Sequence, residues 1–224
     1  MTDKKGPKDT LNIVLLGRSG SGKGTQAKFL CNKFNLEYIG SGDLLREFSN
    51  KDLAVSRRLK RELAEGKLMP TWIPFYLWLD KLVHLPEDKG VLFDGSPRKV
   101  QEAETLEEVL EWFERRNVKA ILIEVSRDEA YKRMILRRIC AKCGNITSLK
   151  THEEAEIKCE NCGEPMRVRP GDHPDAIKAR LDWFEKETQK SIDFYEKKGI
   201  LVRINGEQPI EDVSKEILEK LDVQ

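Results

Sequence analysis

Short apolar runs alternate with longer amphipathic segments along the chain. The short runs are rich in β-branched residues, and each is too brief for a buried helix. The strands predicted from these runs span 11–16, 91–93, 120–125 and 200–204. Between them, apolar residues recur every three or four positions, as in 106–113 and 213–221, which is typical of helices that cover a core. This alternation predicts an α/β fold with a mostly parallel β-sheet flanked by helices.

Two stretches interrupt the alternation. Residues 41–70 are charged and helical in pattern, and residues 139–168 carry four cysteines, little apolar content and several turn formers. Neither stretch could bury a core alone, so we expect both to be insertions into one sheet domain. That core domain would consist of 11–40, 71–138 and 169–224. Residues 1–10 are polar and would form a flexible leader.

Charge and hydropathy exclude several classes of protein. The 40 basic and 39 acidic residues leave a net charge of +1, whereas dedicated nucleic-acid binders carry a clear basic excess. No stretch approaches the roughly 18 consecutive apolar residues of a membrane span. The first ten residues lack the apolar segment of a secretory signal. We therefore expect a cytoplasmic protein with neither nucleic-acid nor membrane partners, and, for want of a further apolar stripe, a monomer.

Four of the five cysteines form two C-x-x-C pairs. In a reducing compartment this spacing favours a tetrathiolate zinc site over disulfides. The predicted metal ligands are Cys140, Cys143, Cys159 and Cys162. Four thiolates leave no open coordination position, so the zinc would be structural. His152, inside the insertion, is either a substitute ligand or, as we favour, an exposed loop residue. Cys31 is predicted to be a small core residue.

The segment GRSGSGKGTQ, 17–26, follows the first predicted strand and is rich in glycine. Such a turn can point backbone N–H groups at a phosphate chain, while the next helix adds its positive end and a lysine reaches the outer phosphates. A merely flexible turn would need neither Lys23 nor this spacing. The common pattern is G-x-x-x-x-G-K-[ST], but here Gly24 follows the lysine and the hydroxyl comes one residue later, at Thr25. We interpret the segment as a nucleotide-binding loop.

Together with other segments, this loop resembles the adenylate kinases, which place a glycine between the lysine and the threonine. The further matching segments are SGDLLR at 41–46, GKLMP at 66–70, DGSPR at 94–98, and the arginines Arg133, Arg137, Arg138, Arg169 and Arg180. They resemble the family's TGDLLR, G-x-L-V-P, DG[FY]PR and R-x-x-G-R-R motifs and its later arginines. Five ordered blocks spread over nearly the whole chain are far more specific than a phosphate loop alone.

The resemblance implies a P-loop NTPase-type core with two mobile inserted subdomains. Residues 41–70 would bind a nucleoside monophosphate, and residues 139–168 would close as a zinc-binding lid. The implied reaction is reversible phosphoryl transfer from Mg-ATP to a nucleoside monophosphate. Catalysis of this kind is mostly positioning and charge neutralisation, for which arginine is suited because its rigid fork binds phosphate oxygens bidentately.

The resemblance also assigns residues to roles. The implied catalytic residues are Lys23, Asp94, Arg98, Arg137, Arg169 and Arg180. The implied ATP-binding residues are Gly20, Ser21, Gly22, Lys23, Gly24, Thr25, Arg133 and Arg137. The implied monophosphate-binding residues are Ser41, Arg46, Leu68, Met69, Gly95, Arg98, Gln101 and Glu102. Arg46 and Arg98 would hold the acceptor phosphate, Arg133 would stack on the donor adenine, and Asp94 would orient the water shell of Mg²⁺.

Some positions depart from the family pattern. Thr71, Ser96, Leu136 and Gly171 stand where an acidic residue, an aromatic residue, a glycine and an aspartate are usual. These departures suggest altered lid packing or hinge behaviour.

A fifth departure bears on the acceptor base. Adenylate-specific members carry a glutamine that reads the base at the position of Glu102, and here Gln101 lies one residue earlier. Glutamine both donates and accepts, as adenine requires, whereas an ionised glutamate only accepts and suits guanine or the amino group of cytosine. A one-residue slip would let Gln101 take the role, and Ser41 keeps the hydroxyl that favours AMP. We expect AMP as acceptor, with GMP, CMP or UMP as the alternative.

The alternative from another class of function is a zinc-ribbon module that binds nucleic acid, with the phosphate loop in a regulatory domain. The near-neutral charge and the lack of interleaved basic and aromatic residues near the cysteines argue against it.

An aromatic stretch follows the GKLMP segment and could stack on a base; it consists of Trp72, Phe75, Tyr76 and Trp78. Their helical spacing favours core packing instead.

Overall fold

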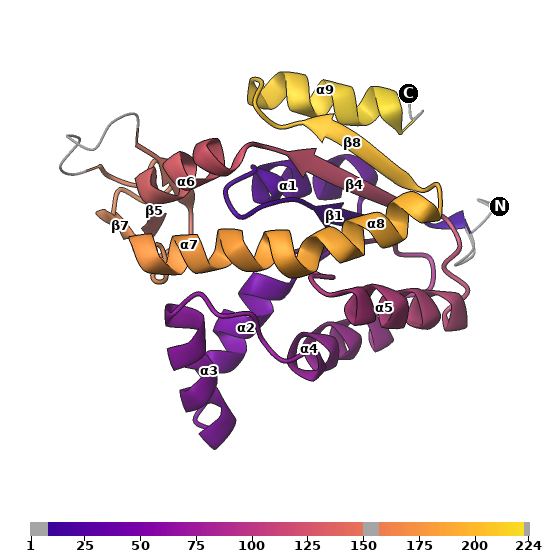
Figure 1. Ribbon diagram of the computed structural model, residues 1–224, viewed down its shortest axis with the longest axis horizontal. Helices are drawn as coiled ribbons and strands as arrows, with labels where there is room; N and C mark the ends of the chain where they lie inside the picture. Colours follow the sequence, from indigo (N-terminus) through magenta and orange to yellow (C-terminus); the bar gives the residue numbers. More distant parts are fainter. Residues whose placement is uncertain (1–8, 150–156, 222–224) are drawn as a thin grey trace.

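A five-stranded parallel sheet forms the centre of the computed structural model, which describes residues 9–149 and 157–221 (Figure 1). Its strands are β1 (Asn12–Leu16), β2 (Glu37–Gly40), β3 (Val91–Asp94), β4 (Val118–Glu124) and β8 (Leu201–Asn205). Their order is β2-β3-β1-β4-β8, and every neighbouring pair runs parallel. This arrangement confirms the α/β fold class predicted from the alternation of apolar runs.

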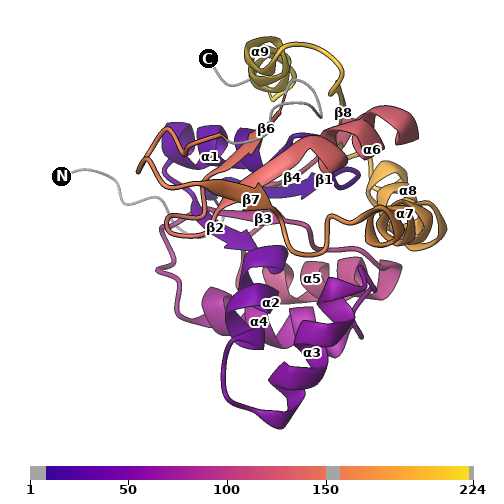
Figure 2. The ribbon, with the colours of Figure 1, turned by 90° about the vertical axis from the view of Figure 1, so that its left-hand side faces the viewer.

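Helices cover both faces of this sheet. The helices of the described residues are α1 (Lys23–Phe34), α2 (Ser41–Ser49), α3 (Ala54–Ala64), α4 (Trp72–Val83), α5 (Val100–Trp112), α6 (Arg127–Leu136), α7 (Pro174–Trp183), α8 (Gln189–Lys197) and α9 (Ile210–Lys220), of which α2 and α3 lie away from the sheet. A π-helical turn, Phe184–Thr188, joins α7 to α8. Figure 2 shows α1 and α9 on one side of the sheet and α4 and α5 on the other.

An apolar cluster on each face of the sheet explains why the sequence of β1 is an almost unbroken apolar run. Successive side chains of a strand point to opposite faces of the sheet. Ile13 and Leu15 pack with α1 and α9, whereas Val14 and Leu16 pack with α4, α5 and α8. Both faces are therefore buried, as is usual for parallel sheets.

Two substructures lie outside the main sheet. Helices α2 and α3 pack on α4 through a small cluster that includes Leu45, Leu59 and Ile73. Strands β5 (Arg137–Cys140), β6 (Ile146–Ser148) and β7 (Met166–Val168) form a separate antiparallel sheet in the order β6-β5-β7. This small sheet lies on the side toward which the carboxyl ends of β4 and β8 point (Figure 1).

The four predicted strands all occur, with ends within two residues of the expected ones. Strand β2 was missed because it has four residues, of which only Tyr38 and Ile39 are apolar, and so short an apolar run does not indicate a strand. Strand β8 is also an edge strand, but its apolar residues Leu201, Val202 and Ile204 revealed it, although only Ile204 is fully buried. None of the helices in the described parts of the chain is long and apolar enough to cross a membrane.

The aromatic residues of α4 do not all pack in the core. Trp78 is buried and makes edge-to-face contacts with Phe75 and Phe93, as core packing requires. For Trp72 and Tyr76 the core interpretation is wrong, since they are 58% and 57% exposed. Residues four apart share a helix face, and theirs is the solvent face. Cys31 is half-buried against the cluster on the α1 face, in agreement with a small packing residue.

Candidate active site

The glycine-rich loop connects β1 to α1 and ends at Gly22, the N-cap of α1. Gly20 and Gly22 have φ values of 88° and 93°, which side chains rarely adopt. At Gly20 a Cβ would also lie 2.7 Å from the carbonyl oxygen of Ala130. Gly24 differs, because it has a helical backbone and a Cβ there would meet nothing within 4 Å. The chain's own packing therefore does not require a glycine after Lys23.

Lys23 points back into the loop from the first turn of α1. Its Nζ donates to the carbonyl oxygens of Gly17 and Arg18 at 2.6 and 2.7 Å. Burial lowers the pKa of Lys23 to about 8, although the Asp94 carboxylate opposes this shift. Asp94 ends β3 beside Leu15 of β1, so it lies at the same sheet edge as the loop. This edge is where parallel sheets bind ligands.

Three arginines from the distant end of the chain converge near this edge. Arg137, the first residue of β5, donates from Nε and Nη2 to Asp172 at 2.7 and 2.8 Å. Arg180 of α7 donates from Nη1 to the same carboxylate at 2.9 Å. Burial lowers the pKa of Arg169 to about 9 and that of Arg180 to about 10, and neighbouring arginines, Arg137 and Arg46 among them, add to both shifts. The cluster carries more positive charge than Asp172 can neutralise, which suits a polyanion such as a phosphate chain.

A second group of charges surrounds the start of α2. Arg46 forms an ion pair with Asp43. The Tyr38 hydroxyl lies 3.1 Å from Asp43 Oδ2 and 3.0 Å from Asp94 Oδ2. Burial raises the pKa of this hydroxyl most, and the two carboxylates raise it further. Because a hydroxyl has one hydrogen, it can donate to only one of the two carboxylates at a time. Tyr38 thereby links the helix that carries Arg46 to Asp94.

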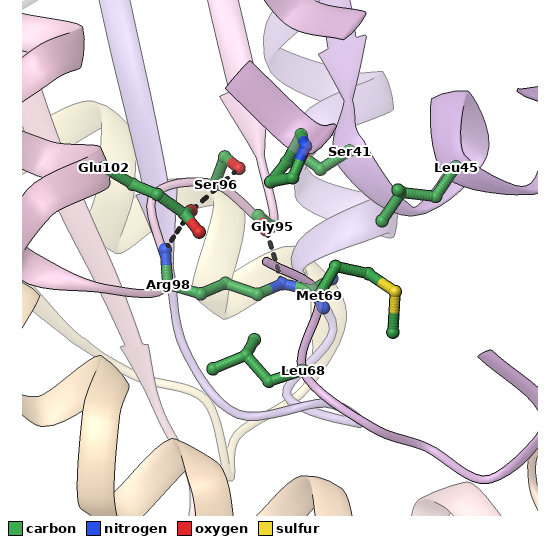
Figure 3. Close-up of a pocket in the computed structure, with 9 residues that line it drawn as sticks. Ser41, Leu45, Leu68, Met69, Gly95, Ser96, Arg98 and Glu102 are labelled. Carbon is green, nitrogen blue, oxygen red and sulfur yellow. Dashed lines mark hydrogen bonds between the residues drawn. The ribbon is translucent and has the colours of Figure 1, made fainter. Parts of the chain in front are cut away.

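A pocket between α2, α5 and the loop after β3 contains most of the predicted monophosphate-binding residues (Figure 3). It is lined by Ser41, Leu45, Leu68, Met69, Pro74, Gly95, Ser96, Arg98 and Glu102. The Arg98 side chain donates from Nε to the carbonyl oxygen of Gly95 at 2.6 Å and lies 5.1 Å from the Trp183 ring. Apolar side chains and one buried carboxylate thus share the pocket with an arginine.

Glu102, and not Gln101, reaches this pocket. Glu102 is 2% exposed, and its Oε2 accepts from the Arg98 backbone N–H at 2.8 Å and from the Ser96 hydroxyl at 3.4 Å. Its Oε1 is buried and has no hydrogen-bond partner in the described parts of the chain. Gln101 precedes it on α5 and is exposed. The structure thus gives no support to the one-residue slip.

Comparison with known proteins decides the family. The family model described as adenylate kinase matches residues 15–200, most of the chain. The chain belongs to the adenylate kinase family. Similar proteins include adenylate kinases from Caldicellulosiruptor bescii, 34% identical over 96% of this chain and the whole of the relative, and from Methanocella arvoryzae, 36% identical over 92% of this chain and 96% of the relative. An adenylate kinase from Archaeoglobus fulgidus is 34% identical over 94% of this chain and 99% of its own.

Membership of the adenylate kinase family makes the chain an enzyme of phosphoryl transfer to nucleoside monophosphates. One departure from the family pattern has a local cause here. Gly171 has φ of 82°, and a Cβ would lie 2.9 Å from Nη2 of Arg180 and 3.2 Å from the carbonyl oxygen of Leu63. Glycine therefore lets the segment that carries Asp172 approach the end of α3 closely.

Other contacts strengthen this junction. Trp183 Nε1 donates to the carbonyl oxygen of Gly66 at 3.0 Å, and a His173 ring nitrogen lies 3.0 Å from the carbonyl oxygen of Ala64. The end of α3 is thus held against α7, the helix that carries Arg180.

The four predicted zinc ligands lie together at one end of the small sheet. The sulfur atoms of Cys140, Cys143, Cys159 and Cys162 all fall within 4.8 Å of one another. Three of the Sγ–Sγ distances are 3.4, 3.4 and 3.6 Å. A tetrahedral site with Zn–S bonds of about 2.3 Å has edges of about 3.8 Å, so the donor set fits zinc. His152 lies outside the described residues.

Some predicted residues occupy surroundings that the sequence did not reveal. Arg133 of α6 donates to Glu129 at 2.6 Å and to the carbonyl oxygen of Gly206 at 3.0 Å, so its guanidinium is held near the start of the C-terminal segment. Arg18, to which the sequence assigned no role, donates to the carbonyl oxygen of Val125 at 2.9 Å and lies 4.8 Å from the Phe184 ring. It joins the loop to the residue that follows β4 and to the π-helical turn.

Two functional candidates were missed by sequence reasoning. Asp172 is the buried partner of two arginines, and Tyr38 lies between two carboxylates. The only signal for Asp172 was its place directly after Arg169, Pro170 and Gly171. No pattern marked Tyr38, since it belongs to the edge strand that was also missed.

Proposed function

We propose that this enzyme transfers the terminal phosphoryl group of Mg-ATP reversibly to AMP, giving two molecules of ADP. The observation that carries the proposal is the convergence of Lys23 and five arginines between the glycine-rich loop and the acceptor pocket. Burial and mutual repulsion lower the pKa of Arg169 and Arg180, so this charge is held close together at an energetic cost. Phosphate groups of two nucleotides would relieve that repulsion.

Each basic residue has a role in this proposal. Lys23 and the backbone N–H groups from Gly20 to Thr25 would hold the donor phosphates. Arg137, Arg169 and Arg180 would neutralise the charge on the transferring group. Arg46 and Arg98 would hold the acceptor phosphate, with Arg98 already positioned against Gly95 and Trp183.

Binding energy would be used to exclude water. The insertion at 41–70 and the lid at 139–168 would close over the nucleotides as mobile subdomains, separate from a core made of 11–40, 71–138 and 169–224. Closure would prevent transfer of the phosphoryl group to water. Arg133 would lie beside the donor base.

Two metals are part of the proposal. Magnesium keeps several water ligands, and Asp94 at the end of β3, at the same sheet edge as the loop, would orient that water shell. Bound with ATP, magnesium would neutralise charge on the phosphates. Zinc would be held by the four cysteine thiolates and would order the lid without taking part in the reaction. Cysteines that bind zinc instead of forming disulfides are typical of a reducing compartment, so we propose a cytoplasmic enzyme. We propose that it is a monomer because the sequence shows no further apolar stripe.

Glu102 favours a second candidate acceptor. An ionised Glu102 would offer only acceptors to the base, and guanine presents donors at its ring nitrogen and its amino group. GMP is therefore the alternative acceptor that a specific observation supports, since Glu102 is the buried polar side chain that α5 contributes to the pocket.

The test is an acceptor panel with Mg-ATP and AMP, GMP, CMP or UMP, in which nucleoside diphosphate is measured. We expect AMP to give the highest kcat/KM near neutral pH. The Lys23→Met variant should lose nearly all activity while it keeps its thermal unfolding transition. Absence of diphosphate with every acceptor would refute the proposed reaction. Clear preference for another monophosphate across the pH range would refute AMP as the acceptor.

A further inference from the structure

Two positions at which the chain departs from its family pattern are in contact. The Ser96 hydroxyl donates to Glu102 Oε2, which also accepts the Arg98 backbone N–H. One carboxylate oxygen is thus fixed by the wall of the pocket. Figure 3 shows the Glu102 carboxylate directed toward the space between Ser96, Gly95 and the Arg98 side chain.

The other oxygen has no such partner. Glu102 Oε1 is buried and receives no hydrogen bond from the described residues. A buried polar atom without a partner costs about 1–3 kcal/mol, and more when it carries charge. A bound molecule that hydrogen-bonds to Oε1 would recover this energy. The apolar walls formed by Leu68, Met69 and Pro74 suit a flat base beside it.

The groups around Glu102 allow either protonation state. Burial raises its pKa, and the Arg98 N–H, the charges of Arg98 and Lys99, and the Ser96 hydroxyl oppose that shift. On the α8 side the neighbouring titratable group is the Tyr195 hydroxyl, whose own pKa is raised by burial and by Glu102.

We propose that the proton on Glu102 Oε1 selects the acceptor base. As a neutral acid, Glu102 donates from Oε1 to a base whose ring nitrogen lacks hydrogen, as in adenine. As a carboxylate, it accepts from a base whose ring nitrogen carries hydrogen, as in guanine. A single hydrogen thus lies between Oε1 and the ring in both complexes. It comes from the enzyme in one case and from the base in the other.

This inference rests on the proposed function, and it predicts that the two acceptors respond to pH in opposite directions. Below the pKa of Glu102 the enzyme prefers AMP. Above it, the ratio of kcat/KM for AMP to that for GMP falls by up to about tenfold per pH unit. The second ionisation of the acceptor phosphate, near pH 6, is common to both nucleotides and cancels in the ratio.

The experiment measures this ratio with Mg-ATP from pH 5 to pH 9 for the wild type, Glu102→Gln and Glu104→Gln. Glu104 is an exposed glutamate on the same helix and serves as the matched control. We expect a falling ratio in the wild type and in Glu104→Gln. In Glu102→Gln the amide has one donor and one acceptor at every pH, so the ratio should be constant and favour AMP.

A second readout does not depend on turnover. Calorimetric titration with AMP alone, above the pKa of Glu102 and in two buffers of different ionisation enthalpy, should detect proton uptake, whereas GMP should cause none. A wild-type ratio that stays constant from pH 5 to pH 9 would overturn the inference and leave the reaction intact. Failure to form diphosphate from either acceptor would overturn the proposed function itself. The wild-type profile and the titration decide the matter even if Glu102→Gln does not fold.

Discussion

Asp172 provides a direct test of how the free enzyme tolerates its arginine cluster. Its carboxylate is fully buried and accepts three hydrogen bonds, two from Arg137 and one from Arg180. Asp172→Asn keeps the size of the side chain, removes the charge, and turns one acceptor into an N–H group that faces an arginine. The two guanidiniums then repel each other without compensation.

The expected loss of stability follows from this burial. Removal of one partner from a buried ion pair costs about 3–5 kcal/mol. The Arg137 and Arg180 side chains keep 16% and 17% exposure and regain some hydration, so we expect about 2–4 kcal/mol. For a chain of this size that corresponds to a fall in Tm of roughly 5–15 °C.

Phosphates should reverse much of this loss. In the proposed complex the arginines bind phosphate oxygens, so the variant should gain more stability from ligand than the wild type does. Urea unfolding would be followed with and without inorganic tripolyphosphate. The control is Asp88→Asn, at an exposed carboxylate in the turn before β3. If Asp172→Asn and Asp88→Asn unfold within about 0.5 kcal/mol of each other, the argument from the buried ion pairs is wrong.

Three further predictions follow from the site and its surroundings. Bound phosphates should raise the pKa of Lys23 from about 8, so binding of tripolyphosphate at pH 8 should be accompanied by uptake of about half a proton per enzyme. Calorimetry in two buffers measures this uptake, and its absence would contradict the argument from burial. Removal of zinc by a chelator should speed amide hydrogen exchange in β5–β7 and leave the main sheet protected, whereas global unfolding would show that the lid supports the core. Gly66→Ala puts a Cβ 2.5 Å from the carbonyl oxygen of Ala176 at φ of 71°. At Gly199, φ is 69° and a Cβ would have no atom within 4 Å, so Gly199→Ala should lower the free energy of unfolding by only roughly 1 kcal/mol. Gly66→Ala should lower it by more. Equal unfolding free energies for the two alanine variants would mean that the backbone at the junction between α3 and α7 moves apart at little cost and that the argument from close contact is wrong.

Local sequence was sufficient wherever one segment carries a complete signal. The apolar runs at β1, β3, β4 and β8 are long enough to indicate strands, although β8 lies at an edge and only its Ile204 is fully buried. The spacings in the loop around Lys23 and in the paired cysteines are required by few other structures. Strand β2 was missed because only two of its four residues are apolar.

The tertiary structure decided the relations between distant segments. The sequence left open whether Gln101 or Glu102 faces the pocket. Neighbouring residues on a helix point about 100° apart, and only the packing of α5 against the rest of the chain decides which of the two points inward. The role of Asp172 became visible only in the structure, where β5 and α7 bring Arg137 and Arg180 to its carboxylate. The sequence by itself thus determined the family, four of the five strands of the main sheet and the residue types of the site. Which buried groups meet, and whether a group such as Glu102 Oε1 lacks a hydrogen-bond partner among the described residues, depends on packing between elements far apart in the chain. No local pattern encodes that packing.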